Sequence, residues 1–359
     1  MLQRTITHNN TIALKEENPT FMKEEKSGHA TLDIVVPVYN TACYLEECIK
    51  SIVDQTFTDW HLIIIDDGST DDSPAICDRW AAADSRISVL HKPNTGQGDC
   101  RNVALSMCSA DYIGFVDSDD WIEQDMYSTL IALLQEQQGD IAICSHVKAY
   151  PKNKKKKKPA EESVEVIDNT TANHLIINGH IQSYVWQMVF RRECIICDMP
   201  NYSCFEDYAV LPHWFEKAKR IVITNRQLYN YRMRASSAVH EYNIEREMAF
   251  IEAEEQRAAY YKGTRFGDEI KVRLVSTCIR AAKYIARMKT LKRTEKYHYL
   301  GEIRQRLVAI DRRFSHKLNA KNRLLHFLLI NNLPVFIAYQ KTETKIIGDK
   351  HKEKKEVFA

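Results

Sequence analysis

Short apolar runs alternate with amphipathic segments along the first 150 residues of the chain. The runs are nearly continuous in apolar residues, which is typical of strands that are covered on both faces of a sheet. Between them, apolar residues recur at helical spacing, as they do from Tyr44 to Val53. Strands that alternate with helices form parallel sheets, so we expect an α/β fold with a doubly wound, mostly parallel sheet. The expected strands are residues 32–38, 61–65, 87–90, 112–116 and 140–144.

Further helices are expected between these strands. Ser73 followed by Pro74 is typical of an N-cap with proline at the first helical position, so a helix should run from there to about Ala83. A third helix is expected over residues 102–107, and from about Tyr242 onward the pattern is helical almost throughout. The sequence therefore predicts an α/β domain followed by a helical C-terminal region.

An acidic run stands where the fourth expected strand should leave the core. It reads Asp117-Ser118-Asp119-Asp120, and we refer to it below as the acidic run. Acids without partners at the end of a core strand repel one another and are costly to desolvate. A divalent cation that holds a phosphate would remove this cost, whereas the plain alternative is a solvated acidic turn.

Polar clusters follow three of the expected strands. They are residues 37–40, residues 66–69 and the acidic run. In doubly wound sheets, ligands bind beyond the carboxyl ends of the strands, so one pocket is expected to gather all three clusters. No glycine-rich dinucleotide motif follows the first strand and no Walker-type loop is found, which argues against those two nucleotide-binding classes.

Composition narrows the class of protein. The 50 basic and 48 acidic residues nearly cancel, so net charge gives no reason to expect nucleic acid as a partner. The ten cysteines are scattered and several sit in apolar runs, which indicates reduced core thiols, and we interpret the close pair Cys194 and Cys197 in the same way. Residues 1–30 are polar, lack an apolar signal core and are expected to form a flexible extension, and no window is apolar enough to span a membrane. We therefore expect a cytoplasmic protein.

Two further segments suggest contacts with partners. The lysine run from Lys154 to Lys158 is expected to be a solvated loop or hairpin tip, and the alternative is contact with an anionic lipid or acceptor. Apolar stretches within residues 324–337 are too short to cross a bilayer. They are expected to pack in the core or in a homodimer, and the alternative is peripheral contact with the inner face of the cell membrane.

Four motifs occur in order in the first half of the chain. They are residues 35–40 (VVPVYN), residues 65–71 (IDDGSTD), residues 94–96 (NTG) leading to Arg101 and Asn102, and residues 115–121 (FVDSDDW). In this order they resemble the landmarks of the GT-A glycosyltransferases of family 2, and the resemblance covers about residues 32–240. It implies a GT-A catalytic domain over residues 31–240, with a donor half 31–122 and an acceptor half 123–240. Composition and periodicity add a flexible extension over residues 1–30, a helical region over 241–340 and a basic tail over 341–359.

The resemblance also implies a donor site. Its nucleotide-sugar-binding residues would be Pro37, Tyr39, Asp67, Gly96, Arg101, Asp117 and Ser118. Asp119 would be the main ligand of a Mn²⁺ or Mg²⁺ ion, since both ions favour carboxylate oxygens. Asp67 would read the nucleotide base, with UDP as the implied nucleotide, and Arg101 would bind the diphosphate unless it forms a surface ion pair. Asp99 replaces a residue that is usually small in the family, and we expect it to contact the donor sugar.

Asp207 would be the general base, because the acceptor hydroxyl must lose a proton as it attacks. Without the family, an acidic pair such as Glu206 and Asp207 at a helix start is only a favourable arrangement for the helix dipole. Trp186 is expected either to stack on a sugar or to pack in the core. Residues implied in acceptor or secondary roles are Asp120, Trp186, Glu206, Arg232, which is expected to face the diphosphate, and His240, which is a candidate metal ligand.

The function implied by the resemblance is transfer of a sugar, with inversion, from a UDP-sugar to a hydroxyl of a glycan or lipid-linked acceptor in cell-surface polysaccharide synthesis. One alternative is a sugar-phosphate nucleotidyltransferase, which would need a glycine- and arginine-rich loop where this chain has residues 38–41. The other is a non-catalytic protein that binds sugar nucleotides. The presence of Asp67, Asp117, Asp119 and Asp207 argues against the second alternative.

Overall fold

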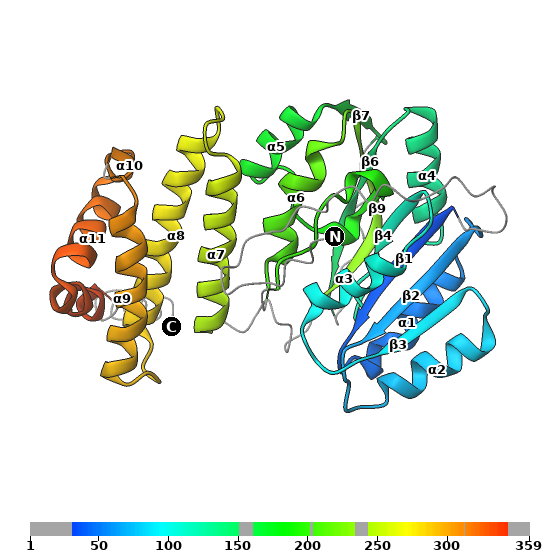
Figure 1. The fold of residues 1–359 in the computed structure, drawn as a ribbon, viewed down its shortest axis with the longest axis horizontal. Helices are drawn as coiled ribbons and strands as arrows, with labels where there is room; N and C mark the ends of the chain where they lie inside the picture. The colour runs from blue at the N-terminus through cyan, green and yellow to red at the C-terminus, as the bar shows by residue number, and fades with distance from the viewer. Residues whose placement is uncertain (1–30, 151–160, 202–203, 234–242, 312, 344–359) are drawn as a thin grey trace, which may run out of the picture. The chain divides into compact units, whose positions relative to one another are not determined.

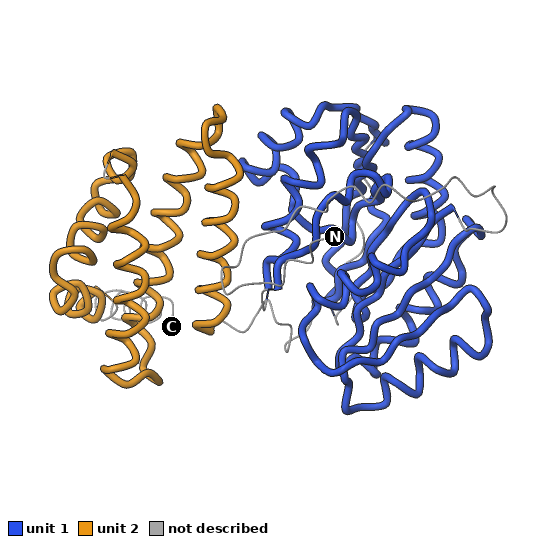
Figure 2. The backbone as a smooth tube through the Cα atoms, in the orientation of Figure 1, with its two compact units in different colours: residues 1–241 blue, residues 242–359 orange. Residues whose placement is uncertain are grey.

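The computed structural model describes residues 31–150, 161–201, 204–233, 243–311 and 313–343. The chain divides into two compact units, Met1–Glu241 and Tyr242–Ala359 (Figure 2). Residues 1–30, the lysine run from Lys154 to Lys158, His240 and the basic tail beyond residue 343 lie outside the described residues.

The first half of unit 1 is a parallel sheet of four strands (Figure 1). These strands, β1 Leu32–Val38, β2 Trp60–Asp66, β3 Ile87–His91 and β4 Tyr112–Phe115, lie in the order β3-β2-β1-β4. The helices between them are α1 Ala42–Val53, α2 Ser73–Ala83 and α3 Gln97–Met107. This arrangement confirms the expected α/β fold with a mostly parallel sheet.

Two of the predicted helix starts are wrong. The helix α2 has Asp72 rather than Ser73 as its N-cap, because the Ser73 hydroxyl instead accepts a hydrogen bond from the backbone N–H of Thr41 at 3.1 Å. The helix α3 begins at Gln97, five residues before the predicted start at Asn102. Its first turns bury Gly98, Cys100 and Arg101, so they lack the apolar spacing that marks a helix in a sequence.

The second half of unit 1 extends the same sheet with strands of mixed direction. β8 Met188–Arg191 pairs antiparallel with β4 and with β6 Ile141–Ala149, and β6 pairs in parallel with the long strand β9 Ile221–Arg232. Two short strands, β5 Trp121–Ile122 and β7 Val164–Ile167, pair antiparallel with β9. The accompanying helices are α4 Met126–Glu136, α5 Asn169–Ile177 and α6 Glu206–Glu216, together with the short 3₁₀ helices Val185–Gln187 and Arg192–Cys194.

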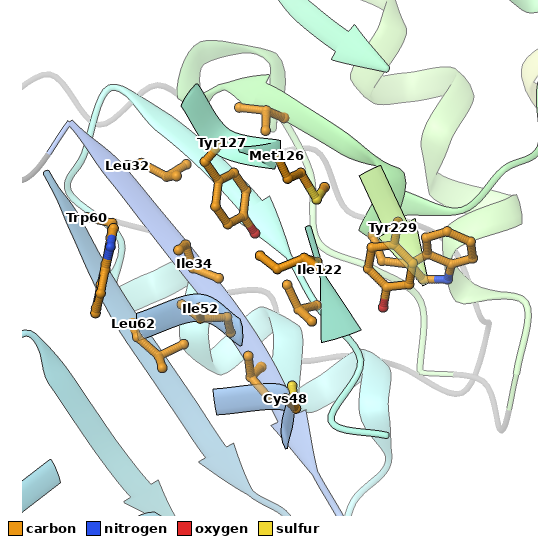
Figure 3. Packing of buried hydrophobic residues seen from close by; sticks show 14 of the residues in the cluster. Leu32, Ile34, Cys48, Ile52, Trp60, Leu62, Ile122, Met126, Tyr127 and Tyr229 are labelled. Atoms are coloured by element: carbon orange, nitrogen blue, oxygen red, sulfur yellow. The ribbon is translucent and has the colours of Figure 1, made fainter. Parts of the chain in front are cut away.

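Both faces of the sheet are buried, as the near-continuous apolar strands predict. Leu32 and Ile34 of β1 pack in one core with Ile52 of α1 and Tyr127 of α4 (Figure 3). Val35, which points to the opposite face, belongs to a second core that includes residues of α3 and α6. Cys194 and Cys197 are both buried in this second core as free thiols, which confirms their structural interpretation.

Unit 2 is helical, as predicted. Its helices are α7 Ile244–Tyr260, α8 Gly267–Arg287, α9 Arg293–Ala309, α10 Arg313–His316 and α11 Ala320–Asn331. In the parts of the chain that the structure describes, no helix combines the length and the apolar character needed to cross a bilayer.

Candidate active site

The loops that follow β1 and β2 are tied to each other at the carboxyl edge of the sheet. The N–H of Asn40 donates to the Ser69 hydroxyl at 3.0 Å, and the Asn40 side chain accepts from the N–H of Thr70 at 2.8 Å. Asp71 accepts from the first N–H of α1, that of Ala42, at 3.0 Å. These bonds hold the two loops in one arrangement, with Asn40 at a φ of 50°, which is uncommon for a residue other than glycine.

Pro37 is tolerated inside β1 because of where the neighbouring strand ends. Val35 bonds toward β4, since its carbonyl accepts from the N–H of Val116 at 3.0 Å, and alternate residues of a strand bond to the same side. Pro37 therefore also faces the β4 side, but pairing of β1 with β4 stops at Val35 and Phe115. The N–H that Pro37 lacks therefore costs the sheet no hydrogen bond. The chain that follows β4 is no longer paired with β1 at this point and leaves the sheet as the acidic run. Tyr39, two residues further on, is half exposed.

Asp67 is buried and holds the loop between β3 and α3. Its carboxylate accepts from the N–H of Thr95 at 2.9 Å, from the N–H of Gly96 at 2.8 Å and from the Lys92 ammonium. Burial opposes ionisation, but these hydrogen bonds outweigh it and keep the Asp67 pKa below its ordinary value. The Cys100 thiol, from the first turn of α3, is a further hydrogen-bond partner of the same carboxylate.

Lys92 is a site residue that the sequence interpretation missed. Its ammonium group contacts Asp67 and lies 3.0 Å from a carboxylate oxygen of Asp99, and it also bonds the Thr95 hydroxyl. Asp99 was expected to contact the donor sugar, and here it takes part in this ion pair. The signal available in the sequence was the position of Lys92 two residues before Asn94, the first residue of the Asn94-Thr95-Gly96 motif.

Arg101 does not face an open diphosphate site, contrary to its expected role. It is fully buried between two carboxylates: one terminal nitrogen donates to Asp117 at 2.7 Å and the other donates to Glu206. Nor does it form the surface ion pair that was the alternative, since Glu206 is buried as well. Gln97 donates to the same Glu206 oxygen at 2.7 Å, so the start of α3 is joined to the start of α6. Arg101 thus connects the acidic run with the acidic pair of α6.

The start of α3 also approaches the segment that precedes α6, and Gly98 permits this approach. A Cβ at Gly98 would lie 2.9 Å from the Pro200 carbonyl oxygen, which is too close for a side chain. The helix α6 is entered through Phe205, which has a φ of 70°. A strained residue of this kind persists only where its surroundings hold it, and such residues gather at functional sites.

Asp207 follows Glu206 in the first turn of α6, where part of the residue stays exposed while its carboxyl is desolvated by the surrounding side chains. Burial and the negative charge of Glu206 raise the pKa of Asp207 to about 8, although Arg101 acts in the opposite direction. The carboxyl therefore changes its protonation state close to neutral pH, which is the property expected of a general base.

Asp120 is held inside the protein rather than facing an acceptor. One oxygen accepts from the Tyr229 hydroxyl at 2.9 Å and the other from the N–H of Arg232 at 2.7 Å, and its side chain has no exposed surface. Burial and the charges of Asp119 and Asp117 raise the pKa of Asp120 well above its ordinary value. The Tyr229 hydroxyl also accepts from the N–H of Asp117 at 3.1 Å.

Arg232 supports the acidic run in the same way instead of facing a diphosphate. Its Nε donates to the Asp119 carbonyl at 2.7 Å, a terminal nitrogen donates to Glu47 at 2.6 Å, and its guanidinium lies 4.5 Å from the Trp121 ring centre. We call Asp120, Tyr229 and Arg232 the β9 brace, because all three join the acidic run to the end of β9. Ser118 adds a bond from the other side, where it accepts from the Thr41 hydroxyl at 3.0 Å.

Trp186 packs in the core, which was one of its two expected interpretations. Its ring stacks on Tyr229 with centres 4.1 Å apart and on Tyr184 at 4.7 Å, and it is almost fully buried.

The acidic run leaves two partly exposed carboxylates, those of Asp117 and Asp119. Among the described residues, no three His, Cys, Asp or Glu side chains lie close enough together to hold a metal ion. Magnesium and manganese sites in nucleotide-binding proteins commonly use one or two carboxylates and complete their coordination with phosphate oxygens and water. This pair of carboxylates therefore fits an ion that arrives with a diphosphate.

Comparison with known proteins agrees with this geometry. The family model described as Glycosyl transferase family 2 matches residues 33–197. Glycosyltransferase GlyG of Streptococcus pneumoniae is 28% identical over 283 residues, which cover 76% of this chain and 91% of the relative. An uncharacterized glycosyltransferase of Haemophilus influenzae is 30% identical over 210 residues, which cover 56% of this chain and 78% of the relative.

Among solved structures, S. aureus TarS 1–349 in complex with UDP-GlcNAc matches with a TM-score of 0.67 and 19% identity, over 88% of this chain and 92% of that chain. This likeness shows the fold, and the sequence matches show the family. The chain therefore belongs to glycosyltransferase family 2 and is a glycosyltransferase with the GT-A fold.

Proposed function

We propose that the enzyme transfers a sugar from a UDP-sugar to a hydroxyl of a glycan or lipid-linked acceptor, with inversion, in the synthesis of a cell-surface polysaccharide. The observation that carries this proposal is one hydrogen-bonded network at the carboxyl edge of the sheet. It runs from Asp67 through the loop at Gly96 and the start of α3 to Glu206, and on through Arg101 to Asp117. The network joins Asp67, the residue proposed to recognise the base, to Asp117 of the acidic run and to Glu206, which directly precedes the proposed base Asp207.

Asp67 and Tyr39 are proposed to bind the nucleoside. A carboxylate is a good acceptor for the imide N–H of uracil, and the half-exposed Tyr39 ring would offer an apolar surface to the nucleoside. The complex of TarS with UDP-GlcNAc supports the choice of UDP by analogy of fold.

Asp207 is proposed to remove the proton of the acceptor hydroxyl as that hydroxyl attacks the anomeric carbon. Its raised pKa supports this role, because a base is most effective when its pKa lies near the pH of the reaction. Attack in a single displacement from the face opposite the diphosphate would invert the anomeric configuration. Glu206 and Arg101 would keep Asp207 in place, since both are buried and bonded to each other.

Asp119, with Asp117 beside it, is proposed to hold a Mn²⁺ or Mg²⁺ ion. Such an ion would supply positive charge against the diphosphate as it leaves. Arg101 orients the Asp117 carboxylate toward this task by occupying one of its oxygens.

Two substitutions test these assignments. Asp119→Ala should abolish the increase in thermal stability that UDP produces in the presence of Mn²⁺, because ligand binding raises apparent stability. Asp207→Asn should keep that increase and lose sugar transfer. Asp54→Asn, which changes an exposed carboxylate just after α1, is the matched control and should do neither.

The nature of the released product separates this proposal from its rivals. Release of UDP together with a glycosylated acceptor supports it. Release of pyrophosphate would instead identify a nucleotidyltransferase, and UDP-sugar binding without turnover with any hydroxyl acceptor would point to a non-catalytic binding protein.

A further inference from the structure

The helix α11 in unit 2 carries large apolar side chains on two opposite faces. Leu325 and Leu329 are buried against the rest of the unit. On the opposite face, Leu324 and Phe327 lie one turn apart, with 47% and 59% of their surfaces exposed. The described residues therefore leave about half of each of these two side chains uncovered. Val335, shortly after the helix, is also exposed.

The chain around α11 carries basic residues and no acidic ones. From residue 312 to residue 342 there is no Asp or Glu. The basic residues in the same stretch are Arg312, Arg313, Lys317, Lys321, Arg323 and Lys341. Lys317 pairs with Asp268 and Lys321 with Glu343, but these lysines stay half exposed, and ion pairs at the surface contribute little. Arg323 is exposed next to Leu324, so positive charge borders the apolar face.

The combination of apolar side chains with bordering positive charge decides between candidate partners. A second copy of this chain packed about a twofold axis would bring the same basic side chains against each other. A nucleic acid would satisfy the charges but leave Phe327 in water. The surface of a bilayer that contains anionic lipids satisfies both, because its headgroups attract Lys and Arg while its acyl boundary accepts Phe and Leu.

We propose that unit 2 docks on an anionic membrane surface through Leu324 and Phe327 of α11, with Arg323 contacting lipid headgroups. The helix would lie in the interface, since its 12 residues are too few to span a bilayer. This contact is independent of the chemistry of the active site. It would concentrate the enzyme where a lipid-linked acceptor is found.

Vesicle binding tests the proposal with the full-length protein. Wild-type protein should sediment with vesicles of phosphatidylcholine and phosphatidylglycerol, should bind pure phosphatidylcholine much more weakly, and should be released as salt is raised. Leu324→Ser and Phe327→Ser should each weaken binding about tenfold, and Arg323→Gln about fivefold. All three residues are exposed, so the variants are expected to fold and to keep UDP binding.

Met107→Ser is the matched control, because Met107 is an exposed apolar side chain of unit 1, at the end of α3. It should bind anionic vesicles as the wild type does. The proposal is overturned if the wild type ignores anionic vesicles or if Met107→Ser weakens binding as much as Phe327→Ser. It is also overturned if Leu324→Ser and Phe327→Ser abolish a concentration-dependent dimer and leave vesicle binding unchanged, since the face would then belong to a second copy.

Discussion

Replacing Tyr229 with phenylalanine would remove a single oxygen atom from the β9 brace. That oxygen donates to Asp120 at 2.9 Å and accepts from the N–H of Asp117 at 3.1 Å. The ring itself would remain stacked on Trp186, so the substitution leaves the core packing in place. The substitution therefore removes only the two hydrogen bonds that join Tyr229 of β9 to the acidic run.

The size of the effect follows from burial. A buried polar group that loses its partner costs about 1–3 kcal/mol. Asp120 keeps its bond from the N–H of Arg232, and its raised pKa favours the neutral carboxyl, which is less costly to leave partly unsatisfied. We therefore expect a loss of about 1–2 kcal/mol in the free energy of unfolding, or a fall of about 3–6 °C in Tm for a unit of this size. Because the backbone N–H of Asp117 loses its partner while the carboxylate keeps Arg101, the affinity for UDP in the presence of Mn²⁺ should fall by up to about tenfold, which corresponds to about 1.4 kcal/mol.

Tyr127 provides the matched control in the same core (Figure 3). Its hydroxyl is buried and has no hydrogen-bond partner among the described residues, so Tyr127→Phe should be neutral or slightly stabilising. Thermal unfolding and titration with UDP and Mn²⁺ would be measured for both variants. If Tyr229→Phe changed neither Tm nor UDP affinity more than Tyr127→Phe does, the brace would have no role in positioning the acidic run.

Four further predictions concern the remaining parts of the site. Arg101→Met should lower the free energy of unfolding by about 3–5 kcal/mol, because it leaves the carboxylates of Asp117 and Glu206 without their common partner. Urea unfolding measures this loss, and a loss below about 1 kcal/mol would contradict the importance of the buried ion pair between Arg101 and Glu206. The turnover rate should rise with pH toward a plateau above about 8, as the Asp207 carboxyl loses its proton, and a rate that falls over the same range would exclude Asp207 as the base. Because of the same raised pKa, Asp207 in the folded protein holds a proton between about pH 4 and pH 8 that the unfolded chain has lost. The contribution of Asp207 to the free energy of unfolding should therefore decline as pH rises through this window. Unfolding experiments at several pH values should show this decline for the wild type and not for Asp207→Asn. Gly98→Ala should lower stability by about 1–3 kcal/mol, since its methyl group would meet a backbone carbonyl oxygen at 2.9 Å, and unchanged thermal unfolding would show that the contact relaxes freely.

The sequence predicted the elements whose signal is local. The strands β1, β2 and β4 are apolar runs ended by polar residues, so both their positions and the acidic run at the edge of the sheet could be read directly. The order of the motifs along the chain was enough to identify the family.

The roles of single side chains were harder to predict, because they depend on partners far apart in the chain. Arg101 was expected at a diphosphate, yet it is buried against Glu206, which lies 105 positions away. The expected roles of Asp120 and Arg232 were wrong for the same reason. The two residues bond each other only because the end of β9 lies beside the acidic run that follows β4. The pairing of Lys92 with Asp67 likewise depends on the arrangement of β3 beside β2.

The bonds between the loops after β1 and β2 have a consequence for engineering this enzyme. Because Asn40 bonds both Ser69 and Thr70, and Asp71 caps α1, neither loop keeps its shape without the other. A chimera that takes one loop from a relative would leave these bonds unmatched, so the two segments should be exchanged together, as a single module. The loop between β3 and α3 is anchored on Asp67 by the backbone N–H groups of Thr95 and Gly96 and by the Lys92 side chain, so an exchange of this loop should keep these three residues.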